Sequence, residues 1–147
     1  MRTTMKGLYA LRAMITLAST SSPESPVAIK KIAEKEDISS EFLQQIFHKL
    51  RKAGIIGAVR GPGGGFYLEK PVESILVSDV LAASGEGLSI GSCSKGKERQ
   101  SKSDCPRNGG KKENVERAEC KACGFWSGME SVIKDFASSR TLADLLE

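Results

Sequence analysis

The sequence predicts a mainly α-helical chain with one small β-hairpin. In the first half of the chain, apolar residues recur at three- and four-residue steps, which is the spacing of an amphipathic helix. A glycine-rich turn near residue 60 separates two short runs of β-forming residues, and helical spacing returns after residue 123. The 147 residues, 39% of them hydrophobic, suffice for one compact core and an appendage.

The first predicted helix spans residues 4–18 and ends before a loop. Its apolar residues share one face, which packs on a core. They are Leu8, Leu11, Met14, Ile15 and Ala18. Pro23 and Pro26 cannot continue a helix, so residues 21–26 form a loop before the next element.

Two short helices joined by a brief turn follow this loop. The first opens near Val27 and stops at Asp37, while the second is capped by Ser39 and ends at Gly54. The second helix has an apolar face of Leu43, Ile46, Phe47 and Leu50 and an opposite polar face of Glu41, Gln45, His48 and Lys52. Such a pair is what a helix-turn-helix requires, although an ordinary helical hairpin with a solvated face explains it equally well.

The predicted β-hairpin favours the helix-turn-helix interpretation. We expect strands at residues 55–60 and 66–69, around a turn in which glycines let the backbone approach a partner closely. A hairpin in this position is a wing, and Arg60 at its tip is the residue type that enters a narrow minor groove of DNA. A phosphate-cradling loop is disfavoured because no Gly-Lys-Ser/Thr follows, whereas a plain structural turn stays open. The formal charge of +4 permits a polyanionic partner but decides nothing.

Four cysteines lie in or beside a long predicted loop. Residues 84–118 are rich in Gly, Ser and Lys and contain Cys93 and Cys105, and Cys120 and Cys123 follow. The N-terminus lacks the apolar core of a signal peptide, and no run approaches the ~20 apolar residues of a membrane span. We therefore expect a cytoplasmic protein without a membrane partner, in which reduced thiols bind metal or act in redox chemistry.

The spacing of Cys120 and Cys123 lets one short turn direct both sulfurs at one metal. Three interpretations stay open: an iron–sulfur cluster, structural zinc, and a thiol pair that switches through a disulfide. Zinc sites usually show two close cysteine pairs, and this chain has one. The alternatives from other classes are a CxxC thiol-redox protein and a protein-interaction module. We expect no enzyme, because no acid, base or nucleophile constellation surrounds the single histidine.

A further helix is predicted after the cysteines. Its apolar stripe consists of Trp126, Met129, Val132, Ile133 and Phe136. Since the N-terminal core already has its helices, we expect this helix to pack on its twin in a homodimer, which places two recognition helices about one DNA turn apart. Thr141 and Asp144 predict a capped final turn.

Three stretches, MRTTMKGLYALRAM, FLQQIFHKLRKAGII and VRGPGGGFYL, resemble the Rrf-type family of bacterial transcription regulators. The resemblance covers about the first 83 residues. It implies a winged helix-turn-helix that dimerises through a long C-terminal helix and binds a partly palindromic double-stranded DNA operator. It also implies a repressor or dual regulator that senses iron–sulfur status, redox state or nitric oxide.

The resemblance also assigns candidate DNA contacts residue by residue. It implies base contacts from Glu41, Gln44, Gln45 and Arg60, with Ser40 at the helix N-terminus, where phosphate is often held. The remaining candidates are phosphate contacts from Arg2, Lys6 and Lys49 and close backbone approach at Gly61, Gly63 and Gly64. His48 faces the same side and receives no role.

In the cysteine region, the resemblance matches Cys93, Cys105 and Cys120 to three cysteines of the family. Cys123 then stands at a further ligand position, followed by Trp126. Eleven residues separate Cys93 from Cys105 and fourteen separate Cys105 from Cys120, which is longer than the family spacing. Both [2Fe-2S] and [4Fe-4S] clusters therefore stay open, with zinc as the alternative.

We predict three segments. Residues 1–83 form the winged helix-turn-helix, residues 84–123 the cysteine-bearing sensor loop, and residues 124–147 the dimerisation helix and C-terminal tail. The predicted function is a DNA-binding transcription regulator that senses through the four cysteines.

Overall fold

The structure is a computed structural model that describes residues 5–85, residue 88 and residues 121–147. It divides into two units. The winged unit consists of Thr3–Gly87 together with Ala137–Glu147, and the other unit contains the C-terminal helix as far as Phe136. The units are described separately below.

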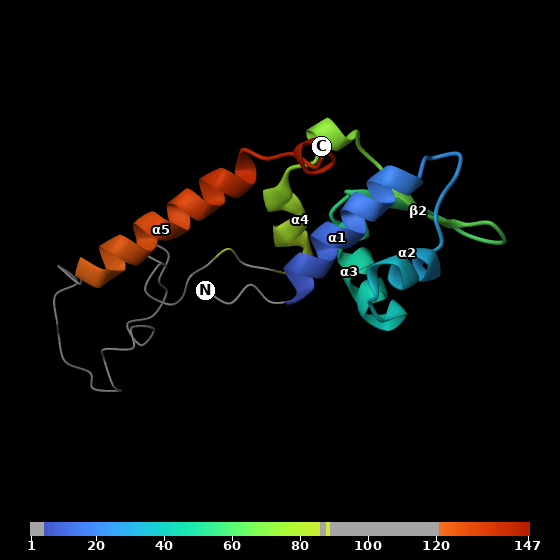
Figure 1. The fold of residues 1–147 in the computed structure, drawn as a ribbon, viewed down its shortest axis with the longest axis horizontal. Helices are drawn as coiled ribbons and strands as arrows, with labels where there is room; N and C mark the ends of the chain where they lie inside the picture. The colour runs from blue at the N-terminus through green and yellow to red at the C-terminus, as the bar shows by residue number, and fades with distance from the viewer. Residues whose placement is uncertain (1–4, 86–87, 89–120) are drawn as a thin grey trace. The chain divides into compact units, whose positions relative to one another are not determined.

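In the described residues, the winged unit contains four α-helices, one hairpin and two short 3₁₀ helices. In chain order they are α1 (Met5–Thr20), α2 (Ile29–Glu36), α3 (Ser40–Lys52), β1 (Ile56–Val59), β2 (Gly65–Leu68), the short 3₁₀ helix η1 (Val72–Ser74), and α4 (Val77–Ser84), as Figure 1 shows. The C-terminal helix α5 spans Lys121–Ser138, and a last 3₁₀ turn, η4, spans Ala143–Leu145. The predicted class, mainly α with a small β-hairpin wing and a C-terminal helix, is confirmed; α4 and η1 were not predicted.

The helix ends follow the predicted signals. Ser39 accepts a hydrogen bond from the Phe42 backbone N–H at 3.1 Å and so caps α3. Gly54, with φ 68°, lies directly after the C-cap residue of α3 in the left-handed conformation that glycine tolerates. Asp37 ends α2 with φ 54°, a conformation that aspartate adopts more readily than most residues.

One hydrophobic core holds the winged unit together. Its largest fully buried side chains come from the helices and the hairpin, and they include Met14, Leu17, Ile32, Leu43, Phe47, Leu50, Ile56 and Val80. The ring of Phe47 on α3 meets that of Phe66 on β2 edge-on, with centroids 5.0 Å apart. Helix α3 is thereby fixed against both α1 and the wing.

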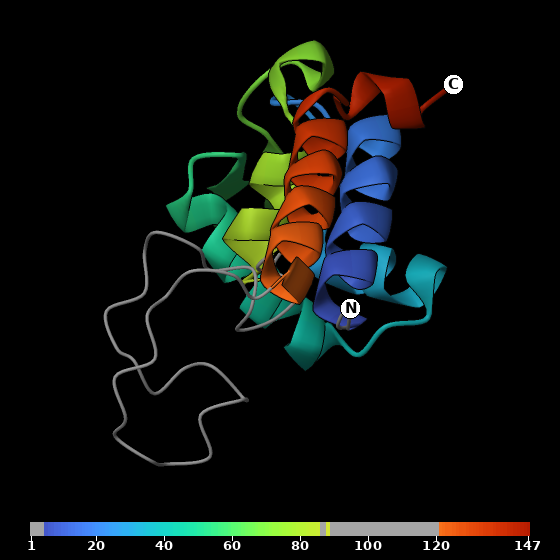
Figure 2. The same ribbon diagram turned by 90° about the vertical axis from the view of Figure 1, so that its left-hand side faces the viewer.

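The end of the chain returns to the winged unit. Leu142 is 1% exposed, and its backbone N–H donates to the Ile75 carbonyl at 2.8 Å. The Val77 N–H donates to the Arg140 carbonyl at 2.9 Å. Figure 2 shows this red C-terminal segment at the same end of the unit as the light-green η1.

The capped final turn predicted at Thr141 is confirmed. The Asp144 carboxylate accepts from the Thr141 backbone N–H at 2.8 Å, and the Asp144 N–H donates to the Thr141 hydroxyl oxygen at 3.4 Å. In the part of the chain that the structure describes, no helix is long and apolar enough to cross a membrane.

Candidate nucleic-acid interface

Most of the predicted base-contacting residues lie on the exposed face of α3. Glu41, Gln44, Gln45 and Lys49 are exposed and line one shallow surface hollow together with His48. Ser40, the first residue of α3, is half-buried. His48, to which the sequence assigns no role, lies four residues after Gln44 and therefore on the same face.

The opposite face of α3 fixes its orientation. Leu43, Ile46, Phe47 and Leu50 are all buried in the core. Because these side chains alternate with the exposed ones at helical spacing, rotating α3 would expose apolar surface and bury polar side chains at once. The core therefore sets which residues α3 presents to a partner.

The hairpin forms a wing beside α3. Strands β1 and β2 pair antiparallel from Ile56 opposite Leu68 to Val59 opposite Gly65. Arg60 follows β1 directly and is exposed, as predicted for a residue at the wing tip. The wing therefore presents the exposed guanidinium of Arg60, followed by a glycine-rich turn whose backbone is largely free of side chains.

The glycines of the wing turn are required by the geometry of the turn itself, apart from any contact with a partner. Gly61 and Gly63 have φ values of 97° and 74°, in the region that favours glycine. A Cβ on Gly64 would lie 2.9 Å from the Gly61 carbonyl oxygen, closer than real Cβ contacts allow. A side chain at any of these three positions would therefore distort the turn.

The wing is also tied to the loop before α2. Val27 and Phe66 exchange two backbone hydrogen bonds, of 2.9 and 2.8 Å. A Cβ on Gly65 would lie 2.7 Å from the Ala28 nitrogen, so the two backbones approach closely only because residue 65 is glycine. Sequence analysis missed this third, single-residue strand, because a single bridge leaves no alternating pattern to detect.

A half-buried carboxylate joins α1 to the end of α2. Glu36 accepts from the Arg12 Nε at 2.9 Å and from the hydroxyl of Thr16, and the Glu36 carbonyl accepts from an Arg12 Nη at 3.0 Å. The Glu36 side chain is only 13% exposed. These contacts hold α2, the first helix of the helix-turn-helix, in place.

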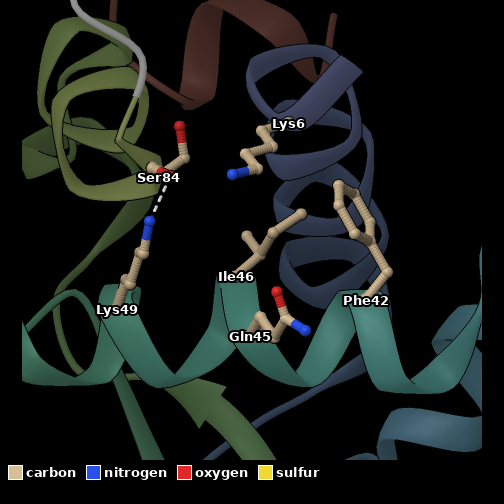
Figure 3. A pocket seen from close by; sticks show the side chains of 6 residues that line it. All are labelled: Lys6, Phe42, Gln45, Ile46, Lys49 and Ser84. Atoms are coloured by element: carbon tan, nitrogen blue, oxygen red, sulfur yellow. Dashed lines mark hydrogen bonds between the residues drawn. The ribbon is translucent and has the colours of Figure 1, made fainter. Parts of the chain in front are cut away.

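Lys49 has a second contact away from the exposed face. Its ammonium donates to the Ser84 carbonyl oxygen at the end of α4, 3.2 Å away, as the dashed line in Figure 3 shows. Lys6 from α1 lines the same small hollow. The sequence suggested phosphate contact for both lysines and gave no sign of the contact with α4.

The remaining predicted site residues lie largely outside the described residues. Arg2, Cys93, Cys105 and Cys120 are outside them, and of Cys123 the structure describes only the backbone, as the third residue of α5. Among the described residues, no group of three or more metal-ligating side chains is found.

Helix α5 carries exposed apolar side chains along most of its length. Phe125, Val132 and Phe136 are each more than 60% exposed, and Trp126 and Met129 are exposed as well. Of the predicted stripe, only Ile133 is half-buried. Large apolar patches of this kind on a helix mark interaction surfaces.

Comparison with known proteins gives one consistent result. The sequence profile of the Rrf2 family, described as an iron-dependent transcriptional regulator, matches residues 3–147. The HTH-type transcriptional regulator IscR of Vibrio campbellii is 37% identical over 100% of this chain and 78% of its own. The fold is similar to that of IscR from T. potens, with a TM-score of 0.72 at 27% identity over 99% of this chain and 86% of that one.

A second solved structure agrees with the first. CymR (YrzC), the global cysteine regulator of B. subtilis, superposes with a TM-score of 0.73 at 26% identity, covering 99% of this chain and 96% of that one. These relatives are transcription regulators, which disfavours the alternative of a thiol-exchange enzyme. The chain belongs to the Rrf2 family and is a winged helix-turn-helix transcription regulator.

Proposed function

We propose that the chain is a cytoplasmic homodimeric regulator whose affinity for its operator, or choice of operator, depends on an iron–sulfur cluster held by Cys93, Cys105, Cys120 and Cys123. The DNA-binding part of this proposal rests on one observation: a rigid, exposed polar face of α3 lies beside an exposed arginine on the wing of the same unit. The family match and the four thiols support the sensing half.

On the DNA side, α3 enters the major groove. Gln44 and Gln45 suit bidentate pairing with adenine, and Glu41 accepts from the amino group of cytosine. The N-terminus of α3 at Ser40 favours a phosphate, because its backbone N–H groups and helix dipole attract anions. Arg60 inserts into the adjacent minor groove, while the wing glycines keep the backbone close to the sugar-phosphate chain.

On the sensing side, the donor set fits a cluster. Four thiolates are the usual ligands of both common cluster types. The first turn of α5, to which Cys123 belongs, contains no acidic residue, and the positive end of a helix dipole favours thiolates at a helix N-terminus. A bound cluster supplies a redox-active group that oxidants and nitric oxide can alter.

The apolar surface of α5 supports the homodimer. A twofold axis would bring the exposed side chains of two α5 helices together and remove them from water. The two recognition helices would then address the two halves of a partly palindromic operator.

Anaerobic purification followed by a visible spectrum and iron, sulfide and zinc analysis tests the proposal. We expect a coloured protein with iron and sulfide in equal amounts, and loss of both in Cys120→Ser but not in Ser103→Ala, a matched control in the same region. Operator shifts with reconstituted and chelator-stripped protein should then differ. Colourless protein with one zinc per chain would overturn the cluster, and identical shifts would overturn the regulation.

A further inference from the structure

Lys49 lies where the DNA-reading face meets the rest of the winged unit. It lines the exposed hollow of α3 together with Gln44, Gln45 and His48. It also lines the small hollow formed by α1, α3 and α4, where its side chain extends toward Ser84 (Figure 3). One side chain thus belongs to both environments.

The contact between Lys49 and α4 is well defined. Helix α4 ends at Ser84, and its C-cap residue Gly85, with φ 93°, donates its N–H to the Ala82 carbonyl, 3.1 Å away. Carbonyl groups at a helix C-terminus carry partial negative charge, and the Lys49 ammonium meets the Ser84 carbonyl oxygen at 3.2 Å. A Cβ on Gly85 would lie 2.8 Å from the Lys49 Nζ. The ammonium therefore lies directly against the end of α4.

Ser84 itself has little freedom to move. It is fully buried, and its hydroxyl donates to the Leu81 carbonyl at 2.7 Å. A displacement of this end of α4 would therefore move a buried residue and alter the hydrogen bond that Ser84 receives from Lys49.

The chain connects this contact to the proposed cluster. Cys93 follows Ser84 by nine residues, so the contact lies close in the sequence to one of the proposed cluster ligands. On α3, Lys49 lies one helical turn after Gln45. The Lys49–Ser84 hydrogen bond thus joins α3, close to the side chains that face DNA, to the end of the helix that precedes the cysteine-bearing segment in the sequence.

We propose that Lys49 is a positioning residue, which couples ligation of the cysteines to operator reading through its hydrogen bond to Ser84. The proposal rests on the proposed function, since it assumes that cluster state and operator binding are linked. It assigns Lys49 a role other than the phosphate contact that its place on α3 alone suggests.

The test compares one quantity among variants: the occupancy ratio, defined as operator affinity after anaerobic reconstitution with ferrous iron and sulfide divided by affinity after chelator stripping. The operator is a duplex selected from a random library by the wild-type chain. Lys49→Met removes the donor, Lys49→Arg keeps it, and Lys52→Met makes the same charge change three residues on, away from Ser84. Affinity is measured by fluorescence anisotropy across a salt series.

We expect Lys49→Met to move the occupancy ratio toward one by roughly three- to tenfold, with Lys49→Arg and Lys52→Met close to wild type. The salt dependence of Lys49→Met should be no shallower than that of Lys52→Met. Lys49 is exposed, so the variant should fold, and Lys49→Gln provides a second removal of the ammonium if it does not.

Two results would overturn the inference, and they differ. If the wild-type ratio departs from one and both Lys49→Met and Lys49→Gln keep it, Lys49 does not transmit cluster state. A salt slope lowered by about 0.9 in those variants would then identify a phosphate contact instead. If the wild-type ratio is one, the proposed regulation itself fails and the role of Lys49 fails with it.

Discussion

Gly65 is a residue at which two backbone segments of the winged unit lie too close together for a side chain to fit between them. Strand β2 begins there, and a Cβ would lie 2.7 Å from the Ala28 nitrogen. Residue 65 must therefore be glycine because a side chain has no space there, and not because of its backbone conformation. It keeps the wing joined to the loop before α2, and so sets where Arg60 stands relative to α3.

Gly65→Ala should destabilise the chain by about 1–3 kcal/mol, because a methyl group has no room beside Val27 and Ala28. Urea denaturation measures the loss. Gly128→Ala is the matched control: its Cβ would meet nothing within 4 Å, and it lies inside α5, so alanine should raise helix stability slightly. Equal midpoints for the Gly65 variant and wild type would contradict the close approach.

Glu36 also has a role beyond its own helix. Glu36→Ala should cost about 1–3 kcal/mol, since it leaves the buried Thr16 hydroxyl and the Arg12 guanidinium without their carboxylate. Glu34→Ala removes the same side chain from an exposed position of α2 and should be nearly neutral. Thermal melts of the two variants measure their stability. Similar losses of melting temperature for both would argue against a stabilising role of the Glu36 contacts.

At the scale of elements, the parts with strong local signals were predictable. Helices α1 to α3 show helical spacing of apolar and polar residues, Ser39 and Gly54 mark the ends of α3, and the glycine-rich turn defines the hairpin. Helix α4 is as short as α2 and, like α2, has no side-chain hydrogen bond at its N-cap, but apolar and small residues occupy most of its positions, so it shows only weak amphipathic spacing.

The contacts between distant elements were not predictable from local pattern. Leu76 pairs with Thr141, and Lys49 bonds to Ser84, although neither pair is close in the sequence. Nothing in the periodicity of either segment encodes its partner, because such contacts depend on how the whole core closes. The exposed face of α3 was predictable for a simple reason: burial of Leu43 and Phe47 dictates which side is left outside.

The capped turn at the end of the chain gives an element-scale prediction about pH. The Thr141 backbone N–H and, secondly, its hydroxyl hold the pKa of Asp144 below its ordinary value. A lowered folded-state pKa adds stability above the unfolded carboxyl pKa of about 3.9, and this stability is lost as pH falls through the folded value. Asp144→Asn should therefore melt below wild type at pH 7, and the difference should shrink in acid. A difference that stays constant down to acid pH would contradict this cause.

At the scale of the whole molecule, the winged unit is completed by the last residues of the chain. Leu142 fills the core, and Thr141 pairs with Leu76 ahead of α4. A fragment that stops at residue 83 would therefore lack part of its own core. The boundaries 1–83, 84–123 and 124–147 stay a prediction to which the structure adds this returning segment.

Leu142→Ala should destabilise the winged unit by about 2–5 kcal/mol, the usual cost of emptying a buried leucine site. Leu146→Ala is the control, since this leucine is 39% exposed four residues later and its truncation should cost far less. Urea denaturation followed by circular dichroism gives both values. Equal losses would mean that the C-terminal segment does not contribute to the core as described.

The central property proposed for the molecule is that α3 and the wing recognise a DNA sequence. Its direct test is the affinity of the wild-type chain, Gln45→Ala and Arg60→Ala for the selected operator and for an unrelated duplex, at fixed salt. We predict that wild type prefers the operator by about 10³-fold or more, and that each substitution lowers operator affinity more than affinity for the unrelated duplex. Equal wild-type affinity for the two duplexes, or unchanged operator binding in both variants, would contradict sequence recognition by α3 and the wing.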